Sequence, residues 1–373
     1  MGLREDALAI LRYQNYQQFP IVHFGFWDET VMKWRQEGHI SPDSDISLFD
    51  NGPLDRFVSG QLGFDFNWQP SASGNMGLLP GLESRILGVL DNGLVKSIDS
   101  NGAIVLTKPG VVSIPSEIGH LLTDRDSWEK LFLPRLQMSE ERIFADHLAT
   151  LQQTDQRVEP VGLYCGSLFG MIRNWLGLEG SAYLLIDDEE LFDEIIDTYA
   201  GLQLTVVRTF LERGAKPDFG HFWEDICCKS GPLISPAVFA EKVGPWYRRF
   251  TDLLSAYGVD LVSLDCDGVI DKLLPIWLDN GVNTMFPIEV GVWDASIKTW
   301  RSQYGRNLRG VGGMNKNVFA QDYAAIDREI ERLLPLVDLG GYIPCPDHRI
   351  PPTAKWENIQ YYCDRLRTVM ASR

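Results

Sequence analysis

The sequence predicts an α/β protein, a (β/α)8 TIM barrel with an N-terminal helical and β extension. Three observations favour this fold: a repeated helix–glycine–strand unit, polar residues at the end of each predicted strand, and sufficient length. A barrel of this kind takes about 250 residues, and the chain has 373. We therefore expect a single domain over residues 1–373, which includes an irregular insertion at about 40–120.

The repeated unit occurs five times in the second half of the chain. In each unit a helix-like run ends on glycine and a short apolar stretch follows; the glycines are Gly214, Gly258, Gly281, Gly305 and Gly340. A glycine after a helix end usually adopts the left-handed conformation, and a short apolar run has the length of a buried parallel strand. The recurrence therefore predicts consecutive βα units.

Each of these predicted strands ends at polar or charged residues that can bind a ligand or take part in catalysis. In a (β/α)8 barrel all strands open onto one face, so we expect these side chains to converge on one site. A helix cap explains any single Asp, Ser or Asn equally well, but it explains all five together poorly. The residues are Glu224 and Asp225, Asp265 and Asp267, Glu289, Asn315 at the end of GGMN, and Asp347 with His348.

The elements before this repeat are indicated by local patterns. Residues 5–16 look helical, 21–27 form a strand candidate, and 28–38 have helical spacing up to Gly38. From 40 to 120, Gly, Pro, Asn and Ser are frequent, and pieces such as GAIVLTKPGVVSI indicate a small hairpin layer with loops.

The middle of the chain returns to longer elements. Helical segments are predicted at 125–153, and PVGLYCG at 160–166 resumes the barrel. The clearest helix is DDEELFDEIIDTYAGLQLTVVRTFLERG, whose start places Asp187 and Glu190 in the positions of a capping box. A further helix opens at Ser235-Pro236, in the N-cap and N1 order that proline favours.

Charge and composition restrict the classes of partner. The net charge is −17 without a basic run, so a polyanion would be repelled and no nucleic acid is expected as partner. No apolar stretch approaches the ~18 residues of a membrane span, and the N-terminus lacks a signal-peptide core, so we expect a cytoplasmic protein without membrane contact. Six cysteines without a C-x-x-C pair are expected as reduced thiols. The oligomeric state stays open, with a homodimer as one option.

The polar strand ends differ in what they offer. His348 lies in GGYIPCPDHRIPP, where it is either a loop histidine held by Asp347 or a rigidly held ligand or acid. Asp265 and Asp267 are two residues apart on an extended segment, which puts both carboxylates on one side and suits a shared proton, a metal or a helix cap. Glu289 follows an apolar strand, and a buried glutamate needs a partner or a raised pKa, either of which suits catalysis.

Aromatic residues near the strand ends form a second candidate set. His23 and Trp27 lie at the end of the first predicted strand, and Trp68, Tyr164 and Trp223 accompany later ones. Together they would furnish an aromatic wall for a substrate. For each one taken singly, packing in the core is the alternative, because large aromatic side chains are usually buried.

Two further motifs bear on the class of chemistry. Gly310, Gly312 and Gly313 in RGVGGMN indicate a close backbone approach or a phosphate cradle, although their spacing is that of neither a dinucleotide-binding motif nor a P-loop. A Ser-His-Asp hydrolase is not expected, because the chain has no G-x-S-x-G nucleophile elbow.

Several motifs in their order resemble the uroporphyrinogen decarboxylase superfamily. They are FPIVHFGFWDETVMKW at the start, SLDCDG in the middle, and GGMNKNVFA, GGYIPCPDHRIPP and WENIQYY near the end. The likeness spans almost the whole chain, and within the superfamily the chain is most similar to corrinoid-dependent methyltransferases of anaerobic O-demethylase systems. The resemblance implies a single (β/α)8 barrel with its site at the C-terminal face.

Two departures distinguish branches of that superfamily. Uroporphyrinogen decarboxylases carry a Pro-x-x-x-MRQAGR run whose arginines hold substrate carboxylates, whereas this chain has Arg35-Gln36-Glu37-Gly38-His39. Thiol and alcohol methyltransferases carry His-x-Cys-Gly and a later Cys as zinc ligands, whereas this chain has Asp265-Cys266-Asp267-Gly268. At the family's ligand places the resemblance therefore implies an oxygen- and nitrogen-rich site for a metal, with zinc as the expected ion, formed by Asp267, Glu289 and His348.

The resemblance implies a methyltransferase that moves a methyl group from an aryl methyl ether, a small methoxylated aromatic, to the cobalt of a separate corrinoid protein. A partner is required because the chain has no D-x-H-x-x-G corrinoid motif. The ether oxygen must be protonated or bound to a Lewis acid as the phenolate leaves. The alternatives are a decarboxylase of a tetrapyrrole or other acid, and a non-catalytic barrel that binds a ligand or a corrinoid protein.

The expected roles divide the candidates into two groups. We expect catalytic roles for Glu224, Asp225, Asp265, Glu289 and His348. We expect substrate contacts from His23, Trp27, Tyr164, Trp223 and Asn315.

Overall fold

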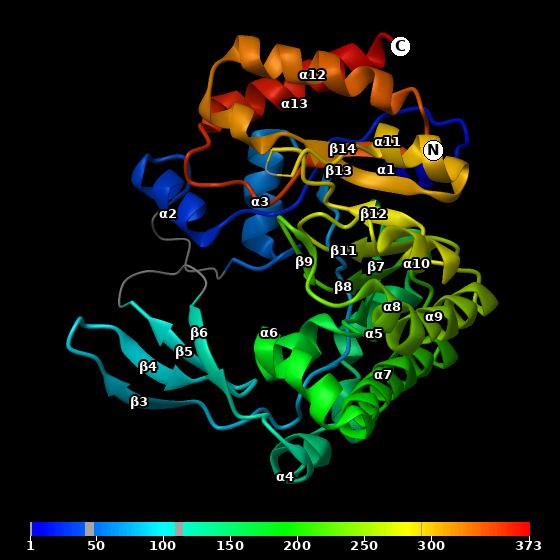
Figure 1. Cartoon of the computed structure of the whole chain (residues 1–373). Helices are drawn as coiled ribbons and strands as arrows, with labels where there is room; N and C mark the ends of the chain where they lie inside the picture. The colour runs from blue at the N-terminus through cyan, green and yellow to red at the C-terminus, as the bar shows by residue number, and fades with distance from the viewer. Residues whose placement is uncertain (1, 42–47, 109–114, 292) are drawn as a thin grey trace.

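The computed structural model describes residues 2–41, 48–108, 115–291 and 293–373. Its centre is a set of parallel strands with helices packed outside them (Figure 1). The parallel strands are β1 (Val22–His23), β2 (Phe66–Asn67), β7 (Gly162–Gly166), β8 (Phe219–Trp223), β11 (Val262–Asp265), β12 (Thr284–Phe286), β13 (Arg309–Met314) and β14 (Tyr342–Pro346).

The hydrogen-bonding order of these strands is that of a barrel. Six of them form one sheet in the order β14-β13-β12-β11-β8-β7, and β1 pairs with β2. Isolated parallel bridges join the two groups at both seams: Ala72, which follows β2, pairs with Leu163 of β7, and Phe26, which follows β1, pairs with Ile350 after β14. The predicted α/β class with a (β/α)8 barrel is thereby confirmed.

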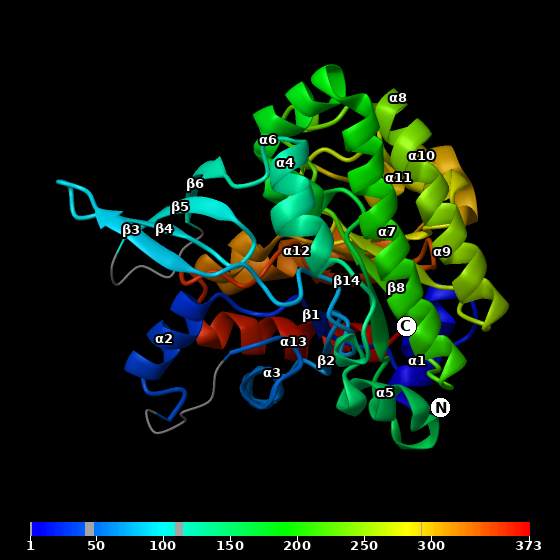
Figure 2. The same cartoon turned by 90° about the horizontal axis from the view of Figure 1, so that it is seen from below.

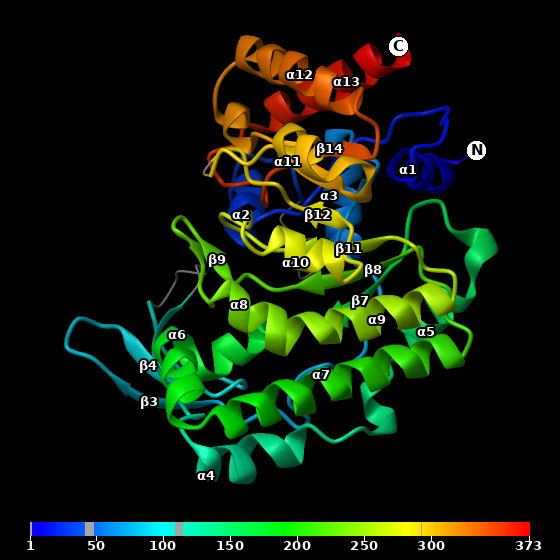
Figure 3. The ribbon, with the colours of Figure 1, turned by 45° about the vertical axis from the view of Figure 1, so that its right-hand side comes forward.

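The helices surround the strands (Figures 2 and 3). Those longer than a single turn are α1 (Leu3–Leu11), α2 (Asp28–Gln36), α3 (Pro53–Leu62), α5 (Ala145–Gln152), α6 (Gly170–Asp187), α7 (Glu189–Glu212), α9 (Gly244–Ala256), α10 (Leu274–Asp279), α11 (Ile297–Tyr304), α12 (Tyr323–Val337) and α13 (Trp356–Ala371). In the described part of the chain, none combines the length and the apolar character that crossing a membrane requires.

The five glycine-stopped units are present as predicted. All five glycines have positive φ, between +60° and +89°. A strand follows each of them, namely β8, β11, β12, β13 and β14. Gly305 differs in detail, because its ψ of −146° lies outside the left-handed helical region.

The predicted insertion at about 40–120 holds two different structures. Helix α3 and strand β2 lie within that range but belong to the barrel, because β2 pairs in parallel with β1. The remainder is an antiparallel sheet that projects beside α6 (Figures 1 and 2), and it matches the predicted hairpin layer. Its strands are β3 (Arg85–Val89), β4 (Val95–Ile98), β5 (Ala103–Thr107) and β6 (Ser116–His120). Residues 109–114 of the predicted piece lie outside the described residues.

Several predicted helix boundaries need correction. The first helix ends at Leu11 rather than at residue 16. The cap of α7 is Asp188, which accepts a hydrogen bond from the Leu191 backbone, and Asp187 is instead the last residue of α6. The segment 125–153 is not uniformly helical: α4 (Arg125–Ser127) leads into a π-turn at Trp128–Phe132 and a 3₁₀ turn at Leu133–Arg135 before α5 begins.

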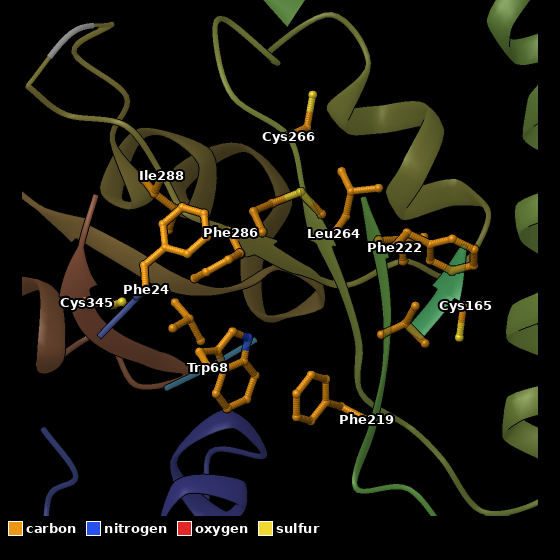
Figure 4. Close-up of a cluster of buried hydrophobic side chains, with 14 of the residues drawn as sticks. Phe24, Trp68, Cys165, Phe219, Phe222, Leu264, Cys266, Phe286, Ile288 and Cys345 are labelled. Carbon is orange, nitrogen blue, oxygen red and sulfur yellow. The ribbon is translucent and has the colours of Figure 1, made fainter. Parts of the chain in front are cut away.

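Side chains alternate between the interior of the barrel and the surrounding helices. On β8, Phe219 stacks on Trp68 inside the barrel with ring centroids 4.5 Å apart, whereas Phe222 packs on Phe250 of α9. Figure 4 shows Trp68 and Phe219 facing each other, with Phe222 on the far side of its strand. Because strand side chains alternate with period two, His221 and Trp223 share the inward face with Phe219.

A close backbone contact holds β13 against the loop that follows β12. Gly312 has φ +132°, and a Cβ atom on it would lie 1.5 Å from the Pro287 carbonyl oxygen. The same carbonyl accepts a hydrogen bond from the Gly313 backbone N–H at 2.9 Å. Of the two interpretations of the RGVGGMN glycines, the close backbone approach is therefore the one present here.

Gly312→Ala should destabilise the fold far more than Gly214→Ala. Both glycines have positive φ, which costs an L-residue about 1–2 kcal/mol, but a Cβ atom on Gly214 meets open space. The Gly312 clash with backbone should bring the loss to on the order of 4 kcal/mol or more. Urea unfolding of the two variants measures the difference, and equal losses would contradict the assigned contact.

Candidate active site

Four carboxylates and one histidine gather beyond the strand ends, and they are Asp225, Asp265, Asp267, Glu289 and His348. Burial raises the pKa values of Asp225, Asp265 and Glu289, and the nearby charge of Asp267 raises each of them further. His348 acts in the opposite direction on Asp225 and Glu289. These mutual effects show that side chains from four different strand ends occupy one site, as the strand-end rule predicts.

The only direct ion-pair contact within this cluster joins β14 to β11. His348 Nε2 lies 3.2 Å from Asp267 Oδ2. Trp27 stacks on the His348 ring with centroids 5.4 Å apart and an angle of 20° between the planes. The second Asp267 oxygen, Oδ1, is buried and has no hydrogen-bond partner among the described residues. The imidazole is thus held between an aromatic face and a carboxylate, with one carboxylate oxygen left over.

Glu289 is a carboxyl group that can hold a proton at neutral pH. Its side chain accepts one hydrogen bond, from the Gly268 backbone at 2.9 Å, and the residue is only 7% exposed. Burial, with the charge of Asp267, raises the pKa of Glu289 to about 7. A carboxylic acid whose pKa matches the ambient pH can either donate or accept a proton, which suits general acid–base chemistry.

The backbone next to Glu289 is fixed by Asp347, which is completely buried. Asp347 Oδ2 accepts hydrogen bonds from the backbone N–H groups of Val290 and Gly291 at 3.0 and 2.7 Å. Its Oδ1 lies 3.2 Å from Lys316 Nζ and also accepts from the Lys316 backbone. Asp347 therefore positions the Glu289 loop, and its charge is already compensated.

Asp265 and Asp225 line the same region from neighbouring strands. Asp265 Oδ2 accepts a hydrogen bond from Gln69 Nε2 at 3.3 Å, and Asp225 Oδ2 lies 3.6 Å from the guanidinium of Arg173. Arg349, the residue after His348, is engaged by Asp50 through both of its terminal nitrogens, at 3.0 and 2.5 Å. The site therefore has an excess of carboxylates, and the cations beside it already have partners.

The expectation that Glu224 lines this site is wrong. Glu224 is completely buried, and its carboxylate accepts hydrogen bonds from the backbone N–H groups of Leu168, Phe169 and Gly170 at the start of α6. The hydroxyl of Tyr247 donates to it as well. A carboxylate with this many donors caps a helix and stabilises its positive end. Glu224 therefore anchors α6, while its neighbour Asp225 faces the site.

His23 also proves to be structural. It is fully buried, its Nδ1 accepts a hydrogen bond from the Gly25 backbone at 2.9 Å, and its Nε2 contacts Ser59 Oγ at 2.8 Å. The Ser59 hydroxyl donates to the Asp55 carbonyl, so His23 must donate from Nε2 and be neutral. Burial lowers its pKa to about 3. The expected substrate contact from His23 is therefore not available.

Asn315 is placed in a similar structural role. Its side chain accepts a hydrogen bond from the Asn317 backbone at 3.0 Å and thereby caps the 3₁₀ turn Lys316–Ala320. Its own backbone N–H donates to Glu329. Trp27, Tyr164 and Trp223, in contrast, are only partly buried. Trp27 follows β1 and Trp223 ends β8, whereas Tyr164 is the middle residue of β7. Of the expected aromatic wall, these three residues remain.

The hollows near the cluster show whether the side chains that converge there also line a cavity. One of about 300 Å³ borders the cluster and is lined by Trp27, Asp50 and Arg349 among others. A larger one of about 580 Å³ lies at the seam of β2 and β7, around Ser73 and His147. The carboxylates of the cluster line neither of these two hollows. We therefore call the group of Asp225, Asp265, Asp267, Glu289 and His348 the acidic rim of the barrel.

The expected zinc ligands do not meet the requirement of a zinc site. Asp267 and His348 are in contact, but Glu289 Oε2 is turned to the Gly268 backbone. Across the described residues, no three His, Cys, Asp or Glu side chains are grouped so that they could hold a metal ion. Structural and catalytic zinc sites need at least three protein ligands. We therefore assign no chemical step to a metal.

Sequence reasoning did not identify several residues that shape the site. Gln69 and Arg173 lie far apart in the sequence and belong to no motif, and Lys316 lies within GGMNKNVFA but was not singled out there. Arg349 directly follows His348, so its place beside a candidate residue was a usable signal. His221 lies two residues before Trp223, and the alternation of a strand would have placed both on the inward face.

Glu289→Gln should change how stability depends on pH. The unfolded glutamate ionises near 4.5 and the folded one near 7. Between these values the unfolded chain binds fewer protons, so the free energy of unfolding falls as pH rises, and the loss is complete above pH 7. Glutamine cannot ionise, and the variant should therefore lose less stability from pH 5 to pH 8. Thermal melts across this range measure it, with the exposed Glu212→Gln as control; parallel curves for wild type and Glu289→Gln would contradict the assigned pKa.

The part of the chain that holds this site matches a known protein family. The family model described as uroporphyrinogen decarboxylase (URO-D) matches residues 114–369. A search of curated proteins finds no match. Among solved structures, a methyltransferase from Methanosarcina mazei is 14% identical with a TM-score of 0.60, and the match covers 99% of both chains.

Two further solved structures are less similar. A B12-independent methionine synthase from Shewanella sp. W3-18-1 is 10% identical with a TM-score of 0.47, covering 86% of this chain and 87% of that one. A putative vitamin-B12-independent methionine synthase from Listeria monocytogenes is 13% identical with a TM-score of 0.40, covering 95% and 99%. The family match spans well over half of the chain and includes β7 through β14 with the acidic rim. The chain belongs to the uroporphyrinogen decarboxylase family.

Proposed function

We propose that the chain is a methyltransferase that moves a methyl group from an aryl methyl ether to the corrinoid of a partner protein. The observation that carries the proposal is a buried carboxyl group, Glu289, whose pKa of about 7 lets it hold a proton in a cluster of carboxylates. Two partly exposed aromatic residues belong to the same region: Trp27 stacks on His348, and Trp223 pairs in register with Asp265. An aromatic ether with a poor leaving group needs this combination.

The chemistry explains why a proton source is decisive. In the transfer, the bond between the methyl carbon and the ether oxygen breaks, and the methyl carbon bonds to the reduced corrinoid, which acts as nucleophile. The ether oxygen keeps the electron pair of the broken bond and takes a proton, so that the product is a neutral phenol. General acid assistance of this kind contributes about 10²–10⁴-fold in rate.

We assign that acid to Glu289, with Asp265 as the second protonated carboxyl of the rim. Burial raises the pKa of Asp265 well above its usual range, and the nearby charge of Asp267 adds to the effect. Asp267 and His348 form the fixed pair of the site, and Trp27 orients the imidazole by stacking on it. Trp27, Tyr164 and Trp223 supply the aromatic surface against which a substrate ring would pack.

A partner protein is part of the proposal because the sequence carries no D-x-H-x-x-G motif of its own. The fold shared with a protein described as a methyltransferase supports this branch of the family. The net charge of −17 disfavours a nucleic-acid partner, and a cytoplasmic location fits a chain with reduced cysteines.

A decarboxylase is the second candidate, since the family is named for that activity. A carboxylated substrate would need free arginine or lysine in the site. Arg349 and Lys316 are instead engaged by Asp50 and Asp347, and Arg173 lies beside Asp225. The acidic rim would repel a polycarboxylate. This charge balance favours the methyltransferase.

Zinc stays a proposal to be tested separately, with Asp267 and His348 as the two donors in contact. Elemental analysis of purified protein, combined with methyl transfer after chelation, separates the two forms of catalysis. With acid catalysis alone, we expect less than one zinc per chain and no effect of chelators. One tightly bound zinc whose removal abolishes transfer would replace Glu289 as the main activator of the ether oxygen.

Glu289→Gln should lower methyl transfer about 10²-fold or more, because glutamine can accept the Gly268 hydrogen bond but has no acidic proton to transfer. The wild-type rate should fall as pH rises above about 7, where Glu289 loses its proton, and the variant should lack that limb. The assay is methylcobalamin formation from 2-methoxyphenol with a reduced corrinoid protein.

His348→Ala should lower the rate by a similar order, whereas the exposed Glu212→Gln should leave it unchanged. Without the corrinoid protein, no turnover is expected from any form of the enzyme. Carbon dioxide released from a carboxylated substrate in the absence of a carrier would instead establish the decarboxylase.

A further inference from the structure

The strongest unexplained feature of the barrel interior is His221. It lies on β8 and is 1% exposed, and neither Nδ1 nor Nε2 has a hydrogen-bond partner among the described residues. Burial lowers its pKa to about 3, so the imidazole is neutral and carries one donor and one acceptor. Buried polar groups in native proteins are nearly always paired, because an unpaired one bears the full cost of desolvation.

The position of His221 directs it toward the substrate region. It shares the inward face of β8 with Trp223, two residues nearer the mouth, which corresponds to a depth of about 6.6 Å below the rim. Its register partners are Tyr164 on β7 and Ser263 on β11. Asp265, two residues beyond Ser263, pairs with Trp223 at the rim. His221 therefore lies directly beneath the acidic rim.

The other groups at this level are apolar rings and neutral hydroxyls. Phe219 and Phe286 present their rings edge-on to His221, with centroids 6.2 and 5.9 Å away. The Ser263 hydroxyl accepts a long hydrogen bond from Trp68 Nε1 at 3.4 Å, and it donates to no described residue. The Tyr164 hydroxyl likewise has no hydrogen-bond partner within the described ranges. Rings with unused neutral donors and acceptors suit a flat aromatic ligand that carries a hydroxyl group.

The charges of the site set a second condition on the ligand. The charge of Asp267 stands above His221, together with Asp225, Asp265 and Glu289, whose pKa values burial raises. The side chains beside His221 itself carry no positive charge. Arg173, Lys316 and Arg349, the cations around the rim, lie beside carboxylates. A carboxylate on the aromatic ring would therefore meet repulsion at the rim and find no cation below it.

We propose that His221 forms, with Tyr164 and Ser263, a subsite for the phenolic hydroxyl of an uncharged methoxylated aromatic, and that the enzyme discriminates against carboxylated ones. This inference rests on the proposed function for the identity of the reaction, but the subsite itself is a matter of binding. The ring packs against Phe286, the hydroxyl meets His221, and the methoxy group is left toward the carboxyl groups of the rim.

The test compares three probes that differ in one substituent: 2-methoxyphenol, methoxybenzene and 2-methoxybenzoate. Binding is measured by calorimetry without any corrinoid protein. For the wild type we expect 2-methoxyphenol to bind about tenfold more tightly than methoxybenzene, the effect of one additional hydrogen bond. The benzoate should bind more weakly than either of them.

His221→Phe is the informative variant because it fills the same space without polar atoms. It should bind methoxybenzene as the wild type does and lose the preference for 2-methoxyphenol, while the benzoate remains the weakest ligand. Its melting temperature should be equal or higher, since an unpaired buried polar group has been removed. Tyr164→Phe, which deletes one hydroxyl, should reduce the preference in part.

The outcomes separate the subsite from the proposed function. A preference for 2-methoxyphenol that survives in both His221→Phe and Tyr164→Phe overturns the subsite, whatever the methyl-transfer assay gives. A marked loss of thermal stability in His221→Phe would show a purely structural histidine and would also overturn it. If the preference is lost as expected but wild type transfers no methyl group from 2-methoxyphenol, the subsite stands and the proposed function fails.

Discussion

The geometry of the candidate site depends on one buried carboxylate, Asp347. Its two oxygens are met by the Val290 and Gly291 backbone, by the Lys316 backbone and by the Lys316 ammonium group. Through these contacts the end of β14 is tied to the loop after β12 and to the turn after β13. Glu289, the proposed acid, and His348, which pairs with Asp267, are the immediate neighbours of the residues held in this way. A buried charge is stable only when it is fully paired, and here the pairing also fixes the site.

The number of donors around each carboxylate decides its chemical role. Glu224 and Glu289 are both buried glutamates beyond strand ends. Glu224 accepts from three backbone N–H groups and from the Tyr247 hydroxyl, so its charge serves the start of α6. Glu289 accepts from one backbone N–H and faces the charge of Asp267. With little to stabilise its ionised form, it retains a proton near neutral pH. The same side chain thus becomes a helix cap in one place and an acid in another.

The barrel interior and its rim impose opposite demands on a ligand. The interior is aromatic and neutral, with the ring pair of Trp68 and Phe219 below and Phe24 against Phe286 at 4.4 Å (Figure 4). The rim is acidic, and the cations beside it lie next to carboxylates. An uncharged aromatic molecule satisfies both regions, because its ring is desolvated in the interior while its reacting oxygen stays within reach of proton donors. Because (β/α)8 barrels host many unrelated reactions, the function of a barrel follows from the chemistry of its site and not from the fold alone.

The sequence by itself determined the barrel and the place of its site. Glycine at a helix end and a short apolar run are local signals, and they sufficed for the units at Gly214, Gly258, Gly281 and Gly340. The rule that parallel strands open on one face was enough to bring Asp225, Asp265, Asp267, Glu289 and His348 together.

Only the tertiary structure decided which of two adjacent polar residues, such as Glu224 and Asp225, faces the site. Adjacent side chains on a strand point to opposite sides, and their polarity does not reveal which side each one takes. Glu224 and Asp225, for which we expected the same role, therefore have different ones: Glu224 caps α6 and Asp225 faces the site. His23 contacts Ser59 and is not available to a substrate. The two-residue strand β2 could not be predicted from its loop-like segment, because it is defined by its pairing with β1, which is a long-range contact. The unpaired nitrogens of His221 likewise follow from the packing of three strands, which no local pattern encodes.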